Sequence, residues 1–179
     1  MRLDDAPRAA DAGSLVYPEW DWRVSAYRSP GATVRLAVAI GELVDAVGAL
    51  AGVESAAATQ KLPLRGSGHN YGIALEDNPE LESTTTAFRA VTAGYFETMG
   101  LRVVAGRGLE PGDRRGDVEE GAVVINRALA ERYFPGVDPL GRRIAFTNRW
   151  DRIVGIVENA AEAELSAEPV PARSMVYEQ

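Results

Sequence analysis

The sequence predicts an α+β fold with a mixed or antiparallel sheet, and three observations carry this prediction. Residues 32–51 repeat apolar side chains at steps of three and four, which is typical of an amphipathic helix. Residues 84–92 alternate and are rich in β-branched side chains, which is typical of a half-exposed strand. Residues 121–136 join an apolar run to a short helical pattern. Helices therefore interleave with strands that expose one face, and such strands favour a mixed or antiparallel sheet.

The first third of the chain holds one strong element. Residues 1–31 are rich in Asp, Ala, Pro and Gly, and we expect this segment to be weakly structured. The helix predicted at 32–51 is expected to end at Gly52, in a left-handed conformation, and residues 53–59 then predict a strand. The apolar stripe of the helix consists of Leu36, Ile40, Leu43, Val47 and Leu50.

The middle third begins with an irregular stretch and becomes regular after it. Residues 61–83 have the Gly, Pro and Asn content of a long mobile loop or a hairpin. After the strand at 84–92, the segment AGYFETMG predicts a short helix that ends at Gly100. LRVVAG, residues 101–106, is the next predicted strand.

The last third packs several local signals closely together. GAVVI predicts a buried strand, Asn126 the N-cap of a helix, and the Pro-Gly dipeptide after Phe134 the end of that helix. DPLG, residues 138–141, predicts a β-turn with Pro139 at its second position. Three strands are predicted beyond it, the first two as a hairpin around Asn148: RRIAF, RIVGIVEN and SMVYE.

Charge and composition exclude several classes of protein. The net charge is -7, whereas nucleic-acid-binding proteins carry clustered basic residues, so no nucleic-acid partner is expected. Cysteine is absent, which excludes disulfides, thiolate catalysis and cysteine-based metal sites. The longest apolar stretch, residues 33–53, carries Arg35, Glu42 and Asp45 and falls short of the roughly 20 uncharged residues of a membrane span. The N-terminus also lacks the basic start and apolar core of a secretory signal.

GLRVVAGRGLEPGD, residues 100–113, looks like a phosphate-binding loop but lacks what such a loop needs. A P-loop has four residues between two glycines, followed by Lys and Ser or Thr. Here five residues separate Gly100 from Gly106, Arg-Gly replaces Lys-Ser/Thr, and no amphipathic helix follows. We therefore expect a structural turn, in which Arg107 and Asp113 pair across the bend.

Candidate catalytic and metal-binding residues are few. Ser67 and the single histidine, His69, suggest a hydrolase, but sequence neighbours rarely form a nucleophile and base pair, and no G-x-S-x-G elbow is present. Acidic clusters at 76–82, 110–113 and 117–120 offer carboxylates to a hard cation, yet none has EF-hand spacing. We expect no catalytic residue, no cofactor and no metal. Ligand stacking is less common for tryptophan than core or interface packing, and this applies to Trp20, Trp22 and Trp150.

Four blocks occur in order along the chain: YF-x-x-MG-L-x-x-x-x-GR (95–107), IN-x-x-x-A-x-x-x-F (125–134), DPLG-x-x-I (138–144) and IVGIV (153–157). Together, over about 52–179, they resemble the MacB-type periplasmic core domain of FtsX-like ABC transporter permeases. The resemblance marks structural positions more than ligand contacts. These signature positions are Tyr95, Phe96, Gly100, Gly106, Arg107, Asp113, Asn126, Phe134, Asp138, Pro139, Gly141 and Gly155.

The resemblance implies a core domain at 32–179, with a porter-like lobe of βαβ units and a smaller variable lobe near residues 61–83. It implies a position on the extracytoplasmic face of a bacterial membrane, between the first two transmembrane helices of a permease. The implied partners are the rest of that permease, a cytoplasmic ABC ATPase subunit and a periplasmic adaptor. Such domains do no chemistry themselves and relay the ATPase cycle to substrate export or extraction.

Two departures from the family pattern lead to a further expectation. The segment before Gly52 matches poorly, and family members usually continue past the last strand with a strand-helix-strand unit. Loss of that unit would expose a sheet edge or an apolar helix face, so we expect a homodimer or a large apolar surface. Two alternatives stay open: a stand-alone ligand- or peptide-binding module of the same fold, and a hydrolase that uses Ser67 and His69.

Overall fold

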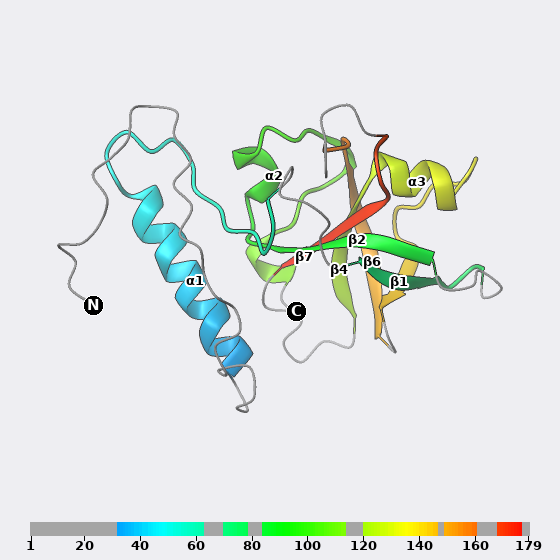
Figure 1. Ribbon diagram of the computed structural model, residues 1–179, viewed down its shortest axis with the longest axis horizontal. Coiled ribbons are helices and arrows are strands. Elements are labelled where there is room, and N and C mark those ends of the chain that lie inside the picture. Colours follow the sequence, from blue (N-terminus) through cyan, green and yellow to red (C-terminus); the bar gives the residue numbers. More distant parts are fainter. Residues whose placement is uncertain are drawn as a thin grey trace.

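A computed structural model describes residues 32–62, 70–78, 84–113, 120–146, 149–160 and 168–176 (Figure 1). The expectation for residues 1–31 lies outside the described residues, as do Ser67, His69, Trp20 and Trp22. The described elements are α1 (Ala32–Gly48), β1 (Asn70–Leu75), β2 (Thr84–Val91), α2 (Tyr95–Thr98), β3 (Val103–Gly106), the 3-10 helix η3 (Pro111–Asp113), β4 (Gly121–Asn126), α3 (Arg127–Tyr133), β5 (Arg143–Phe146), β6 (Arg149–Val157) and β7 (Ala172–Val176).

The strands form one mixed sheet, which confirms the predicted fold class. Their order is β3-β6-β4-β7-β2-β1-β5, and β5 also pairs with β6. All strands except β3 therefore close into a ring, which we also call the barrel. The long strand β6 makes this closure possible, because residues 149–152 pair with β5 while residues 155–157 pair with β3. β4 runs parallel to β6, and β2 runs parallel to β7. Along the chain, α3 and β5 lie between β4 and β6, so the parallel strands β4 and β6 form a βαβ unit with α3.

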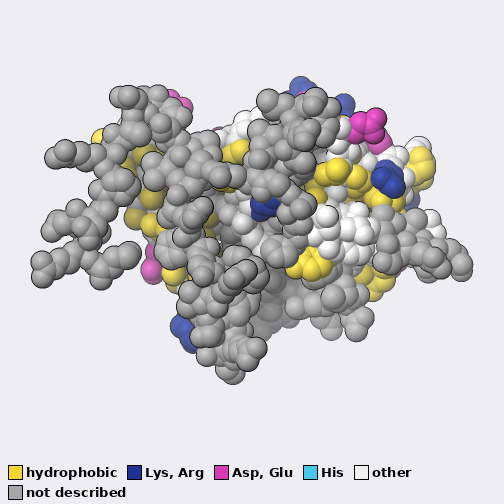
Figure 2. Space-filling view, in the orientation of Figure 1, with side chains coloured by type: hydrophobic (Ala, Val, Ile, Leu, Met, Phe, Trp, Pro, Cys, Tyr) yellow, Lys and Arg dark blue, Asp and Glu magenta, His cyan; other side chains and the backbone are white. Residues whose placement is uncertain are grey.

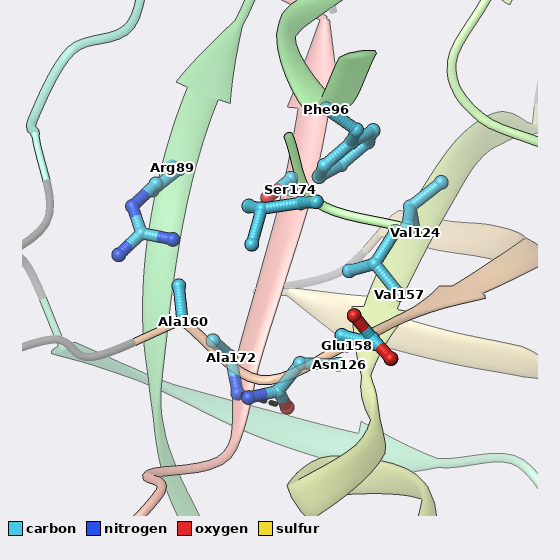
Figure 3. A pocket seen from close by; sticks show the side chains of 10 residues that line it. Arg89, Phe96, Val124, Asn126, Val157, Glu158, Ala160, Ala172 and Ser174 are labelled. Carbon is cyan, nitrogen blue, oxygen red and sulfur yellow. Dashed lines mark hydrogen bonds between the residues drawn. The ribbon is translucent and has the colours of Figure 1, made fainter. Parts of the chain in front are cut away.

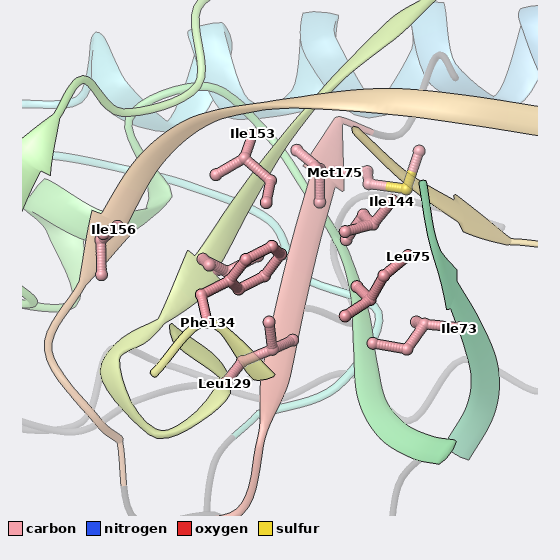
Figure 4. Close-up of a cluster of buried hydrophobic side chains, with 10 residues drawn as sticks. Ile73, Leu75, Leu129, Phe134, Ile144, Ile153, Ile156 and Met175 are labelled. Atoms are coloured by element: carbon pink, nitrogen blue, oxygen red, sulfur yellow. The ribbon is translucent and has the colours of Figure 1, made fainter. Parts of the chain in front are cut away.

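The ring encloses the larger of two apolar clusters. β4 is buried along its whole length because it contributes to both clusters, which explains why GAVVI has no alternation. The outer cluster lies under α2 and includes Tyr95, Phe96 and Val124. Figure 4 shows the inner cluster, which consists of Ile73, Leu75, Val123, Ile125, Leu129, Phe134, Ile144, Ile153, Ile156 and Met175.

Helix α1 stands apart from the sheet at the left of Figure 1 and ends at Gly48, close to its predicted end. Among the described elements, none packs extensively against it. Its apolar stripe is therefore exposed except at Ile40, which is half-buried, and hydrophobic side chains show at the surface in this part of Figure 2. In the described part of the chain, no helix is long and apolar enough to cross a membrane. The exposed fractions are 43% for Leu36, 53% for Leu43, 38% for Val47 and 60% for Leu50.

The strand predicted at 53–59 is wrong except at its end. Only Thr59 forms a bridge, to Val91, and Gln60 N–H donates to the carbonyl of Ala90 at 2.8 Å. The reason is the end of β2, because the antiparallel bridge places residues 53–58 opposite residues 92–97, where β2 has ended and α2 begins. Three successive alanines also offer little side chain to pack. Within 61–83, the described part favours the hairpin, since β1 pairs antiparallel with β2.

The turn that precedes β5 lies one residue later than predicted. Arg142 N–H donates to the carbonyl of Pro139 at 3.1 Å, so Pro139 is the first residue of the turn and not the second. Gly141 occupies the third position with φ 77°, a left-handed conformation that glycine adopts without strain. The Asp138 carboxylate accepts the Leu140 N–H at 2.9 Å and fixes the approach to the turn from outside it.

Candidate functional site

Two facing glycines allow β3 and β6 to cross closely. Gly106 and Gly155 are register partners, and Arg107 N–H donates to the carbonyl of Val154 at 3.0 Å. A Cβ atom on Gly155 would lie 1.8 Å from the Arg107 carbonyl oxygen, and one on Gly106 would lie 2.3 Å from the Val154 carbonyl oxygen. No side chain fits at either position. The signature glycines of GR and IVGIV are therefore explained by close backbone contact.

The predicted pair of Arg107 and Asp113 is confirmed, and its geometry is bidentate. Arg107 Nη1 and Nη2 donate to the two carboxylate oxygens of Asp113, both at 2.7 Å. Arg107 Nη1 also donates to the Gly108 carbonyl at 2.9 Å, and the Glu110 N–H donates to Asp113 Oδ2 at 2.8 Å. The pair thus ties the end of β3 to η3 and closes the loop between them.

The same pair shifts the acidity of both partners. Burial by itself raises the pKa of Asp113, but the hydrogen bonds from Arg107 and Glu110 and the charge of Arg107 outweigh it, so the pKa lies below its ordinary value. The hydrogen bond to Asp113 raises the pKa of Arg107. The Asp113 side chain is only 9% exposed, whereas that of Arg107 is 41% exposed, so the carboxylate is the buried half of the pair.

This geometry gives the loop after β3 a structural role. The polar groups that would cradle a phosphate are already used, because Arg107 and the Glu110 N–H both bind Asp113. A 3-10 helix, η3, follows where a P-loop needs the start of an α-helix. Nucleotide binding therefore has no support in the described loop.

Helix α2 anchors the first signature block in the outer cluster. Tyr95 and Phe96 are 2% and 5% exposed, and their rings meet edge to face with centroids 5.5 Å apart. Gly100 has φ 66° and donates to the Glu97 carbonyl at 2.9 Å, so it ends the helix as predicted. Leu101 N–H then donates to the Phe96 carbonyl at 2.7 Å and directs the chain into β3.

Asn126 joins three segments, of which sequence reasoning found only one. Its Oδ1 accepts the Leu129 N–H at 3.0 Å, which confirms the predicted N-cap of α3. The same Oδ1 accepts the Ala172 N–H at 2.8 Å, and Nδ2 donates to the Val170 carbonyl at 2.8 Å. The side chain therefore also holds the start of β7 against the end of β4. No local sequence pattern predicts this second role, because Val170 and Ala172 are more than 40 residues away from Asn126.

The acidic clusters are used in ion pairs, as far as they are described. Glu76 accepts from Arg143 Nε at 2.7 Å, Asp77 pairs with Arg142, and Glu120 pairs with Arg152 at 2.6 Å. Among the described residues, no group of three or more His, Cys, Asp or Glu side chains could hold a metal ion. The central carbon of the Arg143 guanidinium lies 6.0 Å from the centroid of the Trp150 ring. Trp150 therefore takes part in a cation–π interaction on the surface of the barrel.

One small pocket opens where β4 and β6 end, as Figure 3 shows. Its empty space is about 260 Å³ with the solvent at its mouth included, which is smaller than the roughly 300–1,000 Å³ of typical ligand pockets. The Asn126 side chain in its wall makes the three hydrogen bonds described above, and Glu158 is paired with Arg102. The pocket is lined by Arg89, Phe96, Leu101, Val124, Asn126, Val157, Glu158, Ala160, Ala172 and Ser174.

Two buried arginines are the side chains that sequence reasoning missed. Arg89 on β2 and Arg173 on β7 are 5% and 1% exposed. Burial lowers the pKa of both, and it lowers that of Arg173 to about 10 although the charge of Asp151 opposes the change. A partial signal was available, because Arg89 lies within the strand predicted at 84–92 and Arg173 directly precedes the predicted strand SMVYE.

The signature residues gather at three places in the fold. Tyr95, Phe96 and Gly100 belong to α2 and its end. Gly106, Arg107, Asp113 and Gly155 meet at the crossing of β3 and β6. The third place is the connection from β4 through α3 to β5, where Phe134 is buried in the inner cluster. None of these places combines a nucleophile, a base and a cavity among the described residues, and all three are packing centres.

Comparison with known proteins gives a consistent result. The family model described as "MacB-like periplasmic core domain" matches residues 9–176. The macrolide export ATP-binding/permease proteins MacB of Neisseria gonorrhoeae and Neisseria meningitidis are 29% identical over 79 residues, which is 44% of this chain. That match covers only 12% of those proteins, so the matched part of this chain corresponds to a small portion of each.

Two solved structures share the fold. The periplasmic region of MacB from Actinobacillus actinomycetemcomitans aligns with a TM-score of 0.54 and 18% identity, over 75% of this chain and 53% of that one. The extracellular domain of the noncanonic ABC-type transporter YknZ from Gram-positive bacteria aligns with a TM-score of 0.53 and 17% identity, over 76% and 61%. The family match spans nearly the whole sequence, and the fold agrees with it. The chain therefore belongs to the family of MacB-like periplasmic core domains.

Proposed function

We propose that this chain is the extracytoplasmic domain of an ABC transporter permease and couples the cycle of a cytoplasmic ATPase to substrate export or extraction. The observation that carries the proposal is the family match over residues 9–176. The described fold is compatible with a mechanical role, because its signature motifs serve packing and the small pocket found among the described residues is below the size of a ligand site. We further propose that the domain does no chemistry itself.

The location can be tested by cysteine labelling, because the chain has no cysteine of its own. The full-length protein would carry Glu131→Cys, at an exposed position on α3, in a background without other cysteines. We expect a membrane-impermeant maleimide to label this cysteine in intact spheroplasts. The matched control is Ala145→Cys, because Ala145 is 5% exposed and should react only after denaturation. Labelling of Glu131→Cys only after cell lysis would overturn the proposal.

The partner is tested by co-purification and by ATP hydrolysis. We expect the full-length permease to co-purify with a cytoplasmic ABC ATPase encoded beside it. In lipid nanodiscs, Asp113→Asn should leave ATP hydrolysis intact but reduce substrate release, because it loosens the loop that follows β3. Glu158→Gln disrupts an exposed pair and serves as the control. A panel that includes a macrolide is a sensible first choice of substrate, since the relatives in Neisseria are named macrolide export proteins.

The exposed apolar face of α1 favours a homodimer. Several large apolar side chains of one helix are more than a third exposed, and such a face favours association. We propose that the isolated domain dimerises through this face. Light scattering should report a dimer for the wild type and a monomer for Leu43→Glu. A monomeric wild type would end the proposal. An adaptor in the extracytoplasmic space is a further proposed partner, testable by cross-linking in cells.

The two alternatives predict different outcomes. A stand-alone binding module would be encoded without flanking transmembrane segments and would gain thermal stability from a small ligand or peptide. A hydrolase would lose its activity in a His69→Ala variant. Wild-type protein without hydrolase activity, or a variant that keeps it, excludes the second alternative.

A further inference from the structure

The interior of the ring contains a buried arginine among its apolar side chains. Arg173 is 1% exposed and lies on the same face of β7 as Met175, which belongs to the inner cluster. Side chains two residues apart share a face of a strand, so Arg173 points into the ring. A buried arginine is costly unless neighbouring groups compensate its charge.

The groups around Arg173 come from three other strands. Nη1 donates to Oγ1 of Thr86 on β2 at 3.0 Å, and the guanidinium lies 5.6 Å from the ring centroid of Phe88 on the same strand. The ring of Phe88 meets that of Tyr71 on β1 edge to face, with centroids 5.7 Å apart. Asp151 on β6 is 3% exposed and lies on the same face of β6 as Ile153 of the inner cluster, so it also points into the ring, and its charge raises the pKa of Arg173. We call these five residues the interior arginine cluster.

The register of the strands agrees with this cluster. β2 and β7 are parallel, and Phe88 is paired with Arg173. β1 and β2 are antiparallel, and Tyr71 is paired with Thr86. A slip by one residue in either pairing would turn one partner out of the ring and leave the others without it. Apolar side chains of similar size tolerate such a slip better, because their contacts are not directional.

We propose that Arg173 is the register clamp of the barrel, a buried cation that holds β7, β2, β1 and β6 in a single alignment. The clamp makes the ring move as one body. This inference concerns the fold and stands independently of the proposed transport role. Buried polar groups can fix the register of packed elements at some cost in stability, and here the hydrogen bond from Arg173 to Thr86 joins strands across 87 positions of sequence.

The test uses the whole 179-residue chain and separates stability from alignment. Arg173→Met and Asp151→Asn each remove one charge and leave the other buried, so we expect each to lower the Tm by about 10 °C. The double variant Arg173→Met/Asp151→Leu removes both charges, and its Tm should return to within about 5 °C of the wild type. Its amide protons on β2 and β7 should nevertheless exchange at least about 10-fold faster, because the alignment is no longer fixed. Equal exchange rates in the double variant and the wild type would overturn the proposal.

Two further variants complete the test. Thr86→Val keeps the shape of the side chain and removes its hydroxyl, which accepts from Arg173 and donates to the Tyr71 carbonyl at 3.4 Å. It changes no charge, so we expect this variant to fold. It should speed exchange on β7, and unchanged exchange there would also overturn the clamp. The matched control is Arg152→Gln/Glu120→Gln, an exposed pair that includes the neighbour of Asp151 on β6. We expect this control to change neither the Tm nor the exchange pattern measurably.

Discussion

Helix α1 and the barrel obtain their order from different sources. The sequence of α1 has the clearest periodicity in the chain, yet its apolar stripe is exposed and none of the described elements packs extensively against it. The barrel strands are short and their local signals are weaker, but they enclose an inner cluster in which Val123, Ile125 and Leu129 are fully buried. Local periodicity therefore forms an element, whereas burial determines how much that element contributes to stability.

The largest expected effect comes from the crossing of β3 and β6. Gly155→Ala places a Cβ atom 1.8 Å from the Arg107 carbonyl oxygen, so the two backbones must separate. We expect a loss of about 4 kcal/mol or more in the free energy of unfolding, measured by urea titration. Gly108→Ala is the control, because its nearest neighbours would lie at 3.9 Å. Similar losses in the two variants would mean that the crossing is not the cause.

The contrast itself is tested by the same substitution in both regions. Leu129→Ala empties a fully buried position in the barrel and should cost about 2–5 kcal/mol. Leu43→Ala acts on a side chain that is 53% exposed and should cost less than about 1 kcal/mol, measured below the concentration at which the chain associates. Equal costs would show that the α1 face is packed in the folded chain, and the contrast would fail.

Asn126→Ala should have an intermediate effect. The variant loses the N-cap of α3 and also leaves the Ala172 N–H and the Val170 carbonyl without this partner. Loss of a cap alone costs about 1 kcal/mol, so we expect about 2–3 kcal/mol in total by thermal or urea unfolding. Asn126→Asp keeps the acceptor and should recover part of this loss. If Asn126→Ala lowers the free energy of unfolding by no more than the loss of an ordinary N-cap does, the hydrogen bonds to β7 contribute nothing to stability.

A smaller, pH-dependent effect is expected from Asp113. Its pKa is lowered in the folded state, so its contribution to stability is present above the ordinary carboxyl pKa and is lost as the pH falls through the folded value. The wild type should therefore lose stability between pH 5 and pH 2 more steeply than Asp113→Asn. At pH 7 the variant should cost at most about 1 kcal/mol, because Arg107 is 41% exposed. Parallel pH profiles in urea unfolding would contradict this.

The smallest effect is expected from the exposed pair of Arg102 and Glu158. Both side chains are more than a third exposed, and solvent screens their attraction. Glu158→Gln should change the free energy of unfolding by less than about 0.5 kcal/mol, and by still less in 0.5 M salt. A larger change would give this surface pair an importance that its exposure does not explain.

The sequence by itself determined the elements whose causes are local. The stripe of α1, the Asn126 cap, the end of α2 at Gly100 and the pair of Arg107 and Asp113 all depend on residues within a few positions of one another. These features were predicted correctly, as was the family. The turn at residues 138–141 was misplaced by one residue, because proline and glycine signals overlap there.

Tertiary structure alone decided what depends on distant segments. It closed the ring through β6, left residues 53–58 without a partner strand because β2 ends at Val91, and joined Asn126 to β7. It also placed Arg173 inside the barrel, where only the arrangement of the strands brings Thr86 and Phe88 to it. The physical reason is the same in each case, since edge pairing and burial are shared between segments far apart, and no local sequence pattern records which partner occupies an edge.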